Sequence, residues 1–397
     1  MRILVATNFH PIPPSDGMQL HLYAVLSELR RRHDILLVSP RPTKSSVDER
    51  ELAKICSDHI EYELTYEQPL ISRSLTELRT FLTGRSKVVD CILRSSLRDA
   101  VLREVVSFKP DVIHLQSGAV AALAPIDGVA TVAAPLDADD LNAAARIGAA
   151  SNSAARWMAR REAARFRRFE AEAYARSDEL IVVTQRDSDV LRALNVALRP
   201  TVIPNGIDTI KFRPATDGEP GSAIVFHGAM DYEPNVDAVQ FLVRDILPIV
   251  QKRHPDARVV LAGRNPNAAV RELEAPNVSV TGELDSVVPV IQQAAVYVCP
   301  MRVGSGIKNK LLEAMACGAP IVATPLATAG IEIEKGVHAL VEDQAGSIAS
   351  AISDVLDDPH LRTRLGRAAR ELAEQRSWSR CAQEFERVYA AATGRAR

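Results

Sequence analysis

The chain has 397 residues, with 48 basic and 50 acidic side chains and a formal net charge of -2. This length exceeds one ordinary hydrophobic core and indicates two domains. The balanced charge gives no electrostatic reason to expect nucleic acid as a partner. Five cysteines are scattered without a Cys-x-x-Cys pair, so we expect free thiols in a reducing cytoplasm and no zinc site. No run of about 18 apolar residues occurs, and the chain opens with an apolar strand instead of a signal peptide, so we expect no membrane span.

Short apolar strands alternate with helices in two successive series. The first series predicts strands over 3–7, 34–39, 112–115, 131–135, 179–184 and 201–204, with helices over 20–32, 101–108 and 154–175. The second predicts strands over 222–227, 257–263, 278–281, 295–300, 319–324 and 338–341, with a helix over 237–253. Two such series predict an α/β fold with two doubly wound parallel sheets, each covered on both faces.

A linker separates the two series. Residues 212–222 are rich in Pro, Gly and polar side chains, which is typical of a domain boundary. We therefore expect one domain over 1–211 and a second over 223–376.

The segment 300–324 is the most informative part of the second series. Gly304 and Gly306 flank Ser305 in a short loop after an apolar strand, and a helix over 308–316 follows, ended by Gly318 and Pro320. A glycine-rich turn that opens a helix presents backbone N–H groups and the positive end of the helix dipole. The turn therefore suits phosphate, although glycine before a helix often serves only a tight turn.

Charged side chains on this segment extend the prediction. Arg302 and Lys310 place positive charge on either side of the turn, and Glu313 shares a helix face with Lys310. Since a carboxylate repels phosphate, its natural partner is a pair of sugar hydroxyls. The segment predicts a ligand that carries a diphosphate and a ribose. The structural alternative is that both cations are solvated and Glu313 only pairs with Lys310.

The same segment resembles the donor-binding signature of the family 4 retaining glycosyltransferases, in particular the sugar transferases of bacterial polysaccharide clusters. The matching residues are Arg302, Gly304, Gly306, Lys310, Glu313-Ala314-Met315-Ala316, Gly318 and Pro320-Ile321-Val322. Many members have a second glutamate where this chain has Ser305. The resemblance implies the GT-B fold, in which two Rossmann-like domains face a cleft and a C-terminal helix crosses back to the first domain. Residues 377–397 look like that helix, with Trp378, Phe385 and Tyr389 as apolar anchors.

The resemblance also implies an activity. It is the transfer of a sugar, with retention, from a nucleotide-diphosphate sugar to a hydroxyl acceptor (a glycan, a lipid-linked group or a small molecule), with no metal or other cofactor. Arg302, Lys310 and Glu313 are the implied catalytic residues. The implied donor-binding residues are Gly17, Gly228, Arg264, Gly304, Ser305, Gly306 and Ile307. The first domain is the implied acceptor-binding domain.

Two loops of the first domain depart from the family pattern. Gly17 matches one glycine of a Pro-x-x-Gly-Gly loop, while Asp16 replaces the other. In the segment 111–116, His114 matches the first histidine of an Asp-Val-hydrophobic-His-x-His pattern, and Gln116 replaces the second. We expect Gln116 to contact the acceptor, although an amide cannot transfer a proton at neutral pH.

Three carboxylates follow the strand predicted over 131–135. They lie where an α/β domain binds its ligands, at the carboxyl end of a strand. Asp137 and Asp139 are therefore predicted to contact an acceptor hydroxyl. Capping of a helix by Asp140 is an equal alternative.

Two loops of the second domain also match the family. Gly228 is expected to let the backbone approach the donor, and Asn235 to cap the next helix. Arg264 is expected to stack on the nucleotide or neutralise it, unless it is only a surface residue of a turn.

Other functions remain open on the sequence alone. A sugar-nucleotide 2-epimerase shares the fold, and the departures at Ser305 and Gln116 fit a non-catalytic nucleotide-sugar-binding protein. Arginines at 156, 160, 161, 165, 167 and 168 make the predicted long helix basic, which suits peripheral contact with an anionic membrane on its cytoplasmic face. Interleaved glutamates favour a solvated face instead.

Overall fold

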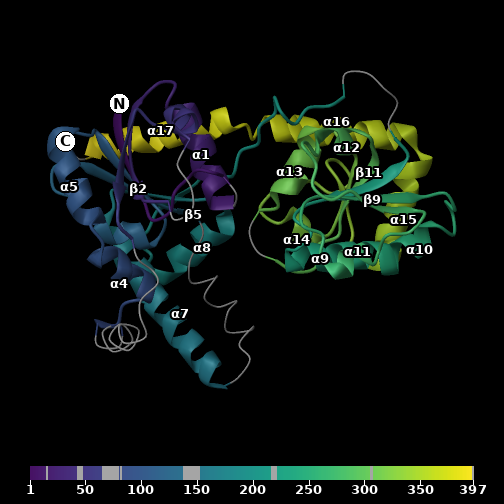
Figure 1. The fold of residues 1–397 in the computed structure, drawn as a ribbon, viewed down its shortest axis with the longest axis horizontal. Helices are drawn as coiled ribbons and strands as arrows, with labels where there is room; N and C mark the ends of the chain where they lie inside the picture. The colour runs from purple at the N-terminus through teal and green to yellow at the C-terminus, as the bar shows by residue number, and fades with distance from the viewer. Residues whose placement is uncertain are drawn as a thin grey trace. The chain divides into compact units, whose positions relative to one another are not determined.

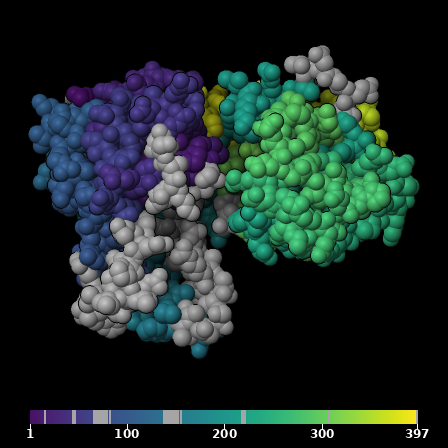
Figure 2. Space-filling model, in the orientation of Figure 1, coloured from purple at the N-terminus to yellow at the C-terminus, as the bar shows by residue number. Residues whose placement is uncertain are grey.

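The structure is a computed structural model, and it describes residues 1–14, 17–42, 48–64, 80, 83–136, 153–215, 221–304 and 307–395. The chain divides into two compact units. The first combines Met1–Pro204 with Trp378–Arg397, and the second is Asn205–Ser377 (Figure 1). In Figure 2 the green residues of the second unit form one compact body.

The described part of the first unit contains a seven-stranded parallel sheet in the order β3-β2-β1-β4-β5-β6-β7. Its strands are β1 (Arg2–Thr7), β2 (Asp34–Pro40), β3 (Asp58–Tyr62), β4 (Val112–Gln116), β5 (Ala130–Leu136), β6 (Glu179–Val182) and β7 (Pro200–Val202). Its helices are α1 (Gly17–Leu29), α2 (Glu49–Ile55), α4 (Lys87–Arg94), α5 (Leu97–Ser107), α7 (Ser153–Ala173), α8 (Gln185–Leu194) and α17 (Trp378–Arg395), with 3-10 turns at Ala119–Leu123 and Tyr174–Arg176.

Both faces of this sheet are buried, as the unbroken apolar strands predict. Ile3 and Val5 of β1 pack in one cluster with residues of α1 and α17, while Leu4 and Ala6 pack in another with residues of α4 and α5. Successive side chains of a strand point to opposite faces, so a strand covered by helices on both sides must be apolar throughout.

The last helix returns to the first unit, as the resemblance implied. Phe385 and Tyr389 of α17 are fully buried in the cluster that contains α1, and Trp378 packs at its edge. Figure 1 shows α17, in yellow, beside α1. Tyr389 Oη lies 2.6 Å from His114 Nδ1 on β4, which adds a buried polar contact.

The described part of the second unit contains a six-stranded parallel sheet in the order β10-β9-β8-β11-β12-β13. Its strands are β8 (Ala223–His227), β9 (Arg258–Ala262), β10 (Val278–Val280), β11 (Ala294–Cys299), β12 (Ile321–Ala323) and β13 (Leu340–Val341). Its helices are α9 (Glu233–Phe241), α10 (Leu247–Val250), α11 (Ala268–Arg271), α12 (Val288–Gln292), α13 (Asn309–Ala316), α14 (Pro325–Thr328), α15 (Ala345–Asp357) and α16 (Pro359–Glu374).

The helix predicted over 237–253 is interrupted. A π-helical turn over Leu242–Ile246 separates α9 from the short α10, which has Pro248 in its first turn. Proline has no N–H and its ring crowds the carbonyl four residues earlier, so a regular α-helix cannot continue through this position. The prediction that Asn235 caps this helix is also wrong. The N-cap is Tyr232, and Asn235 lies inside α9.

The chain passes into the second unit earlier than residue 211. Ile207 N–H donates to the Arg376 carbonyl at 2.7 Å, which ties residues after Pro204 to the second unit. Phe212, the first residue of the predicted linker, is buried in the core of that unit. The functions predicted for the two domains, and a cleft between them, stay predictions.

Candidate functional site

The strand order of the second sheet turns back between β8 and β11, which are neighbours in the sheet. In open parallel sheets, ligands bind outside the carboxyl ends of the strands at such a switch point. Gly228 directly follows β8, and Arg302 follows shortly after β11. Two residues that the sequence marked therefore flank the switch point.

Two glycines let the loops after β8 and β9 touch. A Cβ atom at Gly263 would overlap the Gly228 carbonyl oxygen, and a Cβ at Gly228 would lie 2.8 Å from Asn235 Nδ2 and 3.0 Å from Lys310 Nζ. The φ angles of Gly263 and Gly228 are +147° and +157°, which disfavour any other residue. Bare backbone therefore lies beside the ammonium group of Lys310.

Lys310 is a buried cation that forms no ion pair with any described residue. It lies on α13, donates a hydrogen bond to Asn235 Oδ1, and has its Nζ 4.7 Å from the centre of the Phe226 ring. Burial lowers the pKa of this ammonium to about 8. No carboxylate in the described part of the chain forms an ion pair with it. A buried charge left without a counter-ion is costly, so this position favours an anionic ligand.

Glu313 shares the face of α13 with Lys310, and one of its oxygens is held by a hydrogen bond. His227 Nε2 lies 2.6 Å from Glu313 Oε2, and Tyr297 Oη lies 3.0 Å from His227 Nδ1. Burial alone would raise the pKa of Glu313, but the His227 hydrogen bond and nearby cations outweigh burial and lower it. Glu313 is therefore ionised at neutral pH. Within the described residues, its Oε1 has no hydrogen-bond partner.

Arg302, in contrast, has a carboxylate partner. Its Nε lies 3.1 Å from Asp237 Oδ2 and its Nη2 lies 2.6 Å from Asp237 Oδ1, while its Cζ lies 4.2 Å above the centre of the Phe241 ring. The hydrogen bonds to Asp237 raise the pKa of Arg302. The guanidinium is therefore fixed in orientation, with N–H groups to spare for a ligand.

Packing fixes α13 itself. Arg370 of α16 donates to the carbonyl oxygens of Ala316, at the end of α13, and of Phe212. A Cβ at Gly366 of α16 would overlap the Gly318 carbonyl oxygen, so the two segments are in direct contact. This packing holds the helix that carries Lys310 and Glu313 against the sheet.

Comparison with known proteins identifies the family. The model of "Glycosyltransferase Family 4" matches residues 15–211, and the model of "Glycosyl transferases group 1" matches residues 221–358. The chain belongs to the family 4 glycosyltransferases.

Curated relatives of this glycosyltransferase include the phosphatidyl-myo-inositol mannosyltransferase of Mycolicibacterium smegmatis. That protein is 30% identical over 203 residues, which cover 48% of this chain and 52% of the relative. The chain thus spans about half the length of the mannosyltransferases that it matches. Glycogen synthase of Mycobacterium tuberculosis is 25% identical over 421 residues, covering 99% of this chain and 95% of the relative.

Solved structures confirm the fold. Sucrose-phosphate synthase from Thermosynechococcus elongatus matches with a TM-score of 0.68 and 16% identity, covering 99% of both chains. HepE from Anabaena, in complex with UDP, matches with a TM-score of 0.67 and 14% identity, covering 98% of this chain and all of the other. The glycosyltransferase therefore has the predicted GT-B fold.

Three residues of the site were not anticipated from the sequence. They are His227, Asp237 and Lys308, the last of which is buried just before α13 and has its pKa lowered by burial. One signal for His227 was available, because it ends an apolar strand at a carboxyl end, where α/β domains place their ligand contacts. Asp237 offered no comparable signal, since its partner Arg302 is 65 residues away.

Other predicted donor residues lie around the same sheet edge. Gly304 has a φ of +110°, Ile307 is half-buried, and Ser305 and Gly306 lie outside the described residues. Arg264 is exposed, and among the described residues its guanidinium has no ion-pair partner. Next to it, a pocket of about 330 Å³ lies beyond β9 and β10. Its lining includes Asn265, Arg271, Glu274, Thr281, Gly282 and Glu283.

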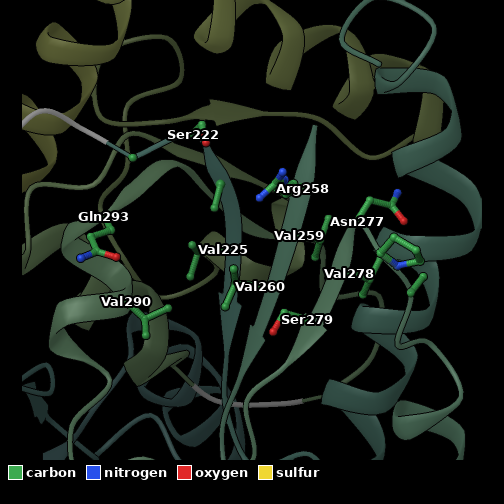
Figure 3. A pocket seen from close by; sticks show the side chains of 14 residues that line it. Ser222, Val225, Arg258, Val259, Val260, Asn277, Val278, Ser279, Val290 and Gln293 are labelled. Atoms are coloured by element: carbon green, nitrogen blue, oxygen red, sulfur yellow. The ribbon is translucent and has the colours of Figure 1, made fainter. Parts of the chain in front are cut away.

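A larger pocket of about 480 Å³ lies at the opposite edge of the sheet. Figure 3 shows Arg258, Asn277 and Gln293 around it. These residues stand at or near the amino ends of β9, β10 and β11, away from the glycine loops. Since parallel sheets bind ligands at their carboxyl ends, we do not assign this pocket to the donor.

Of the predicted acceptor residues in the first unit, the structure describes Gln116 but not Asp137 or Asp139. Gln116 is fully buried; its Oε1 lies 2.8 Å from His114 Nε2, and its Nε2 donates to the Ala134 carbonyl. These contacts give no support to a direct acceptor contact, which stays a prediction. Burial lowers the pKa of His114 to about 4, so this imidazole is neutral. Gly17 begins α1 with open space around it.

Asp137 and Asp139 lie outside the described residues, directly after β5. The described edge nearby has its own unusual features. Ser117 and Leu136, at the carboxyl ends of β4 and β5, have φ angles of +84° and +71°, and the buried Ser117 Oγ has no hydrogen-bond partner among the described residues. Strained backbone with an unpartnered hydroxyl is typical of a binding edge.

No group of three or more His, Cys, Asp or Glu side chains in the described ranges is arranged to hold a metal ion. No helix among the described residues is both long enough and apolar enough to cross a bilayer.

Proposed function

We propose that the chain transfers a sugar from a nucleotide-diphosphate sugar to a hydroxyl acceptor, with retention of configuration at the anomeric carbon. The observation that carries this proposal is the buried Lys310 ammonium, which forms no ion pair with any described residue and lies beside the bare backbone of Gly228. It is an anion site at the switch point of a parallel sheet. Relatives named as a mannosyltransferase and a glycogen synthase, and structures of HepE with UDP and UDP-glucose, support a nucleotide-sugar donor.

The donor diphosphate would lie between Lys310 and Arg302. As the bond from the sugar C1 to the phosphate oxygen breaks, negative charge grows on the diphosphate. Both cations would then bind the transition state more tightly than the ground state, which is electrostatic catalysis. The new bond forms from the acceptor oxygen to C1 on the same face, and the acceptor proton passes to the departing phosphate oxygen. No metal or other cofactor takes part in this proposal.

The nucleoside would lie alongside. Glu313 Oε1 is available to accept hydrogen bonds from the ribose hydroxyls. The pocket that includes Asn265 and Glu283 lies beyond β9, close to the exposed Arg264, and would receive the base. The acceptor would bind at the carboxyl edge of the first unit, near Ser117 and the stretch that contains Asp137 and Asp139.

We also propose peripheral contact of the first unit with an anionic membrane on its cytoplasmic face, through the start of α7. Trp157 and Met158 are 57% and 56% exposed, and Arg156 and Arg160 are exposed beside them. Later arginines of the helix pair with glutamates, as Arg165 does with Glu162 at 3.1 Å. Aromatic and basic side chains together suit a lipid interface.

The decisive experiment measures release of nucleoside diphosphate from UDP-, GDP- and dTDP-sugars with candidate hydroxyl acceptors. Transfer to an acceptor with retained configuration supports the proposal. Conversion of the sugar nucleotide without an acceptor would indicate a 2-epimerase, and binding without turnover would indicate a binding protein. Absence of both binding and turnover for every donor would refute the proposal.

A further inference from the structure

We propose that His227 and Tyr297 are positioning residues that hold Glu313 toward the donor ribose and away from Lys310, an inference that rests on the function proposed above. The three residues come from three elements that meet at the switch point. His227 ends β8, Tyr297 lies inside β11, and Glu313 lies on α13. Their polar atoms form a continuous chain, with distances of 3.0 Å from Tyr297 Oη to His227 Nδ1 and 2.6 Å from His227 Nε2 to Glu313 Oε2.

Chemistry sets the direction of the hydrogen bond to Glu313, and the tautomer of a neutral imidazole then sets the other. Glu313 is ionised at neutral pH and can only accept, so His227 Nε2 must carry a proton. In a neutral imidazole, Nδ1 is then an acceptor, and Tyr297 must donate its hydroxyl proton to it. Burial raises the pKa of Tyr297 well above its usual value, which keeps that proton in place. His227 and Tyr297 are both buried, so solvent does not compete for these contacts.

The chain of hydrogen bonds separates two opposite charges. Lys310 and Glu313 are three residues apart on one helix face, a spacing at which such side chains pair readily. A pair between them would neutralise the ammonium that the diphosphate needs and occupy the oxygen that the ribose needs. Because His227 holds Glu313 Oε2, no ion pair forms between the two in this structure, and Oε1 stays available.

Substitutions of His227 test this directly. His227→Leu removes the donor, whereas His227→Gln keeps an N–H that can reach Glu313. We expect His227→Leu to bind UDP and GDP about tenfold more weakly, since a hydrogen bond to a charged group contributes about that much to affinity. Their 2′-deoxy forms should lose less affinity, because they make one contact fewer to Glu313 but still need the Lys310 ammonium. His227→Gln should restore most of the preference for ribose, and Tyr297→Phe should weaken it partially. Isothermal titration calorimetry measures each affinity.

The pH dependence gives a second readout. If Glu313 turns to Lys310 in His227→Leu, the loss of nucleotide affinity that begins near the Lys310 pKa of about 8 should shift to higher pH. Among the described residues, the charged and titratable groups that face this pair are His227, Tyr297, Cys299, Cys317, Lys308 and Lys211. A structural defect alone would not change the pH at which nucleotide affinity begins to fall.

Val259→Ala is the matched control, because Val259 is a buried residue of β9 whose strand partners are Ile224 and Val278, not His227 or Tyr297. If His227→Leu lowers ribose and deoxyribose affinities alike, as a packing defect would, the positioning role is refuted. If His227→Leu does not fold, as judged by circular dichroism, the partial effect of Tyr297→Phe decides, and its absence also refutes the role. If the unaltered protein binds neither UDP nor GDP, the proposed function itself fails and the positioning role fails with it.

Discussion

The buried ammonium of Lys310 ties donor binding to pH. Its pKa is lowered to about 8 by burial, and its hydrogen-bond partner is the neutral amide of Asn235. A diphosphate binds the protonated form, so apparent affinity follows the protonated fraction. That fraction is about 0.9 at pH 7 and about 0.1 at pH 9, which predicts a loss of about tenfold across this interval.

The assay is calorimetric titration of UDP or GDP at several pH values between about 7 and 9. Lys310→Arg is the informative variant, because a guanidinium stays charged throughout this range. We expect it to bind more weakly than the unaltered protein but with little dependence on pH. Lys252→Arg, an exposed lysine of the same unit, serves as the control and should behave as the unaltered protein. An equal pH dependence in Lys310→Arg and the unaltered protein would refute the reasoning, since the titrating group would then lie elsewhere.

The same group affects stability, and the sign can be worked out. The folded pKa, about 8, lies below the ordinary value of 10.5. Between these two values the unfolded chain binds more protons, so the contribution of Lys310 to stability increases as pH rises. Below pH 8 both states are protonated, and the folded state carries the full penalty of burying the charge. Lys310→Met should therefore raise the melting temperature at pH 7, by about 2 °C or more, while donor binding falls. A lower melting temperature would contradict this account.

Three further predictions concern the same sheet edge. Glu313→Gln should raise the donor KM about tenfold to a hundredfold, because a charged acceptor for the ribose is lost, and unchanged kinetics would remove Glu313 from the site. Gly263→Ala should lower nucleotide affinity and melting temperature together. Gly336→Ala, where an added Cβ would meet nothing within 4 Å, should lose only about 1–2 kcal/mol of stability and keep nucleotide affinity; equal effects would show that close approach is not required. Arg302→Ala should lower kcat as well as donor affinity, and Asp237→Asn should have a smaller effect in the same direction; near-normal kcat in Arg302→Ala would place the diphosphate elsewhere.

The sequence predicted the strands of both sheets except β3, because most of the signals are local. Strand β3 (Asp58–Tyr62) lies at the edge of its sheet and is only partly buried, so it has no unbroken apolar run to mark it. Each apolar run of the first and second series formed a strand, since both sheets are covered on both faces and require apolar residues throughout. The glycine turn and the spacing of Lys310 and Glu313 are local too. A parallel sheet gathers the carboxyl ends of its strands at one edge, so Gly228, Arg302 and Lys310 could be expected there together.

The contacts that tune the site could not be predicted in this way. His227 and Glu313 are 86 residues apart, and only the pairing of β8 with β11 and the packing of α13 bring them together. The error at Asn235 has a local cause instead. Pro234 suits the first turn of a helix because its φ is already helical, so α9 starts before Asn235. The Asn235 amide is thereby free to donate to the Ala229 carbonyl and to receive Lys310.

Arg302 and Lys310, for which the sequence predicted the same role, differ in whether a carboxylate is already paired with them. Arg302 is already paired with Asp237, which compensates most of its charge whether or not a ligand is bound. What Arg302 offers a diphosphate is a set of oriented N–H groups. No carboxylate among the described residues forms an ion pair with Lys310, so most of the gain of pairing a desolvated charge is left for the ligand. Electrostatic catalysis is most effective when the stabilising charge is not already paired with another group before the reaction. We therefore expect Lys310 to supply the larger part of the stabilisation of the leaving group, and Arg302 to orient it.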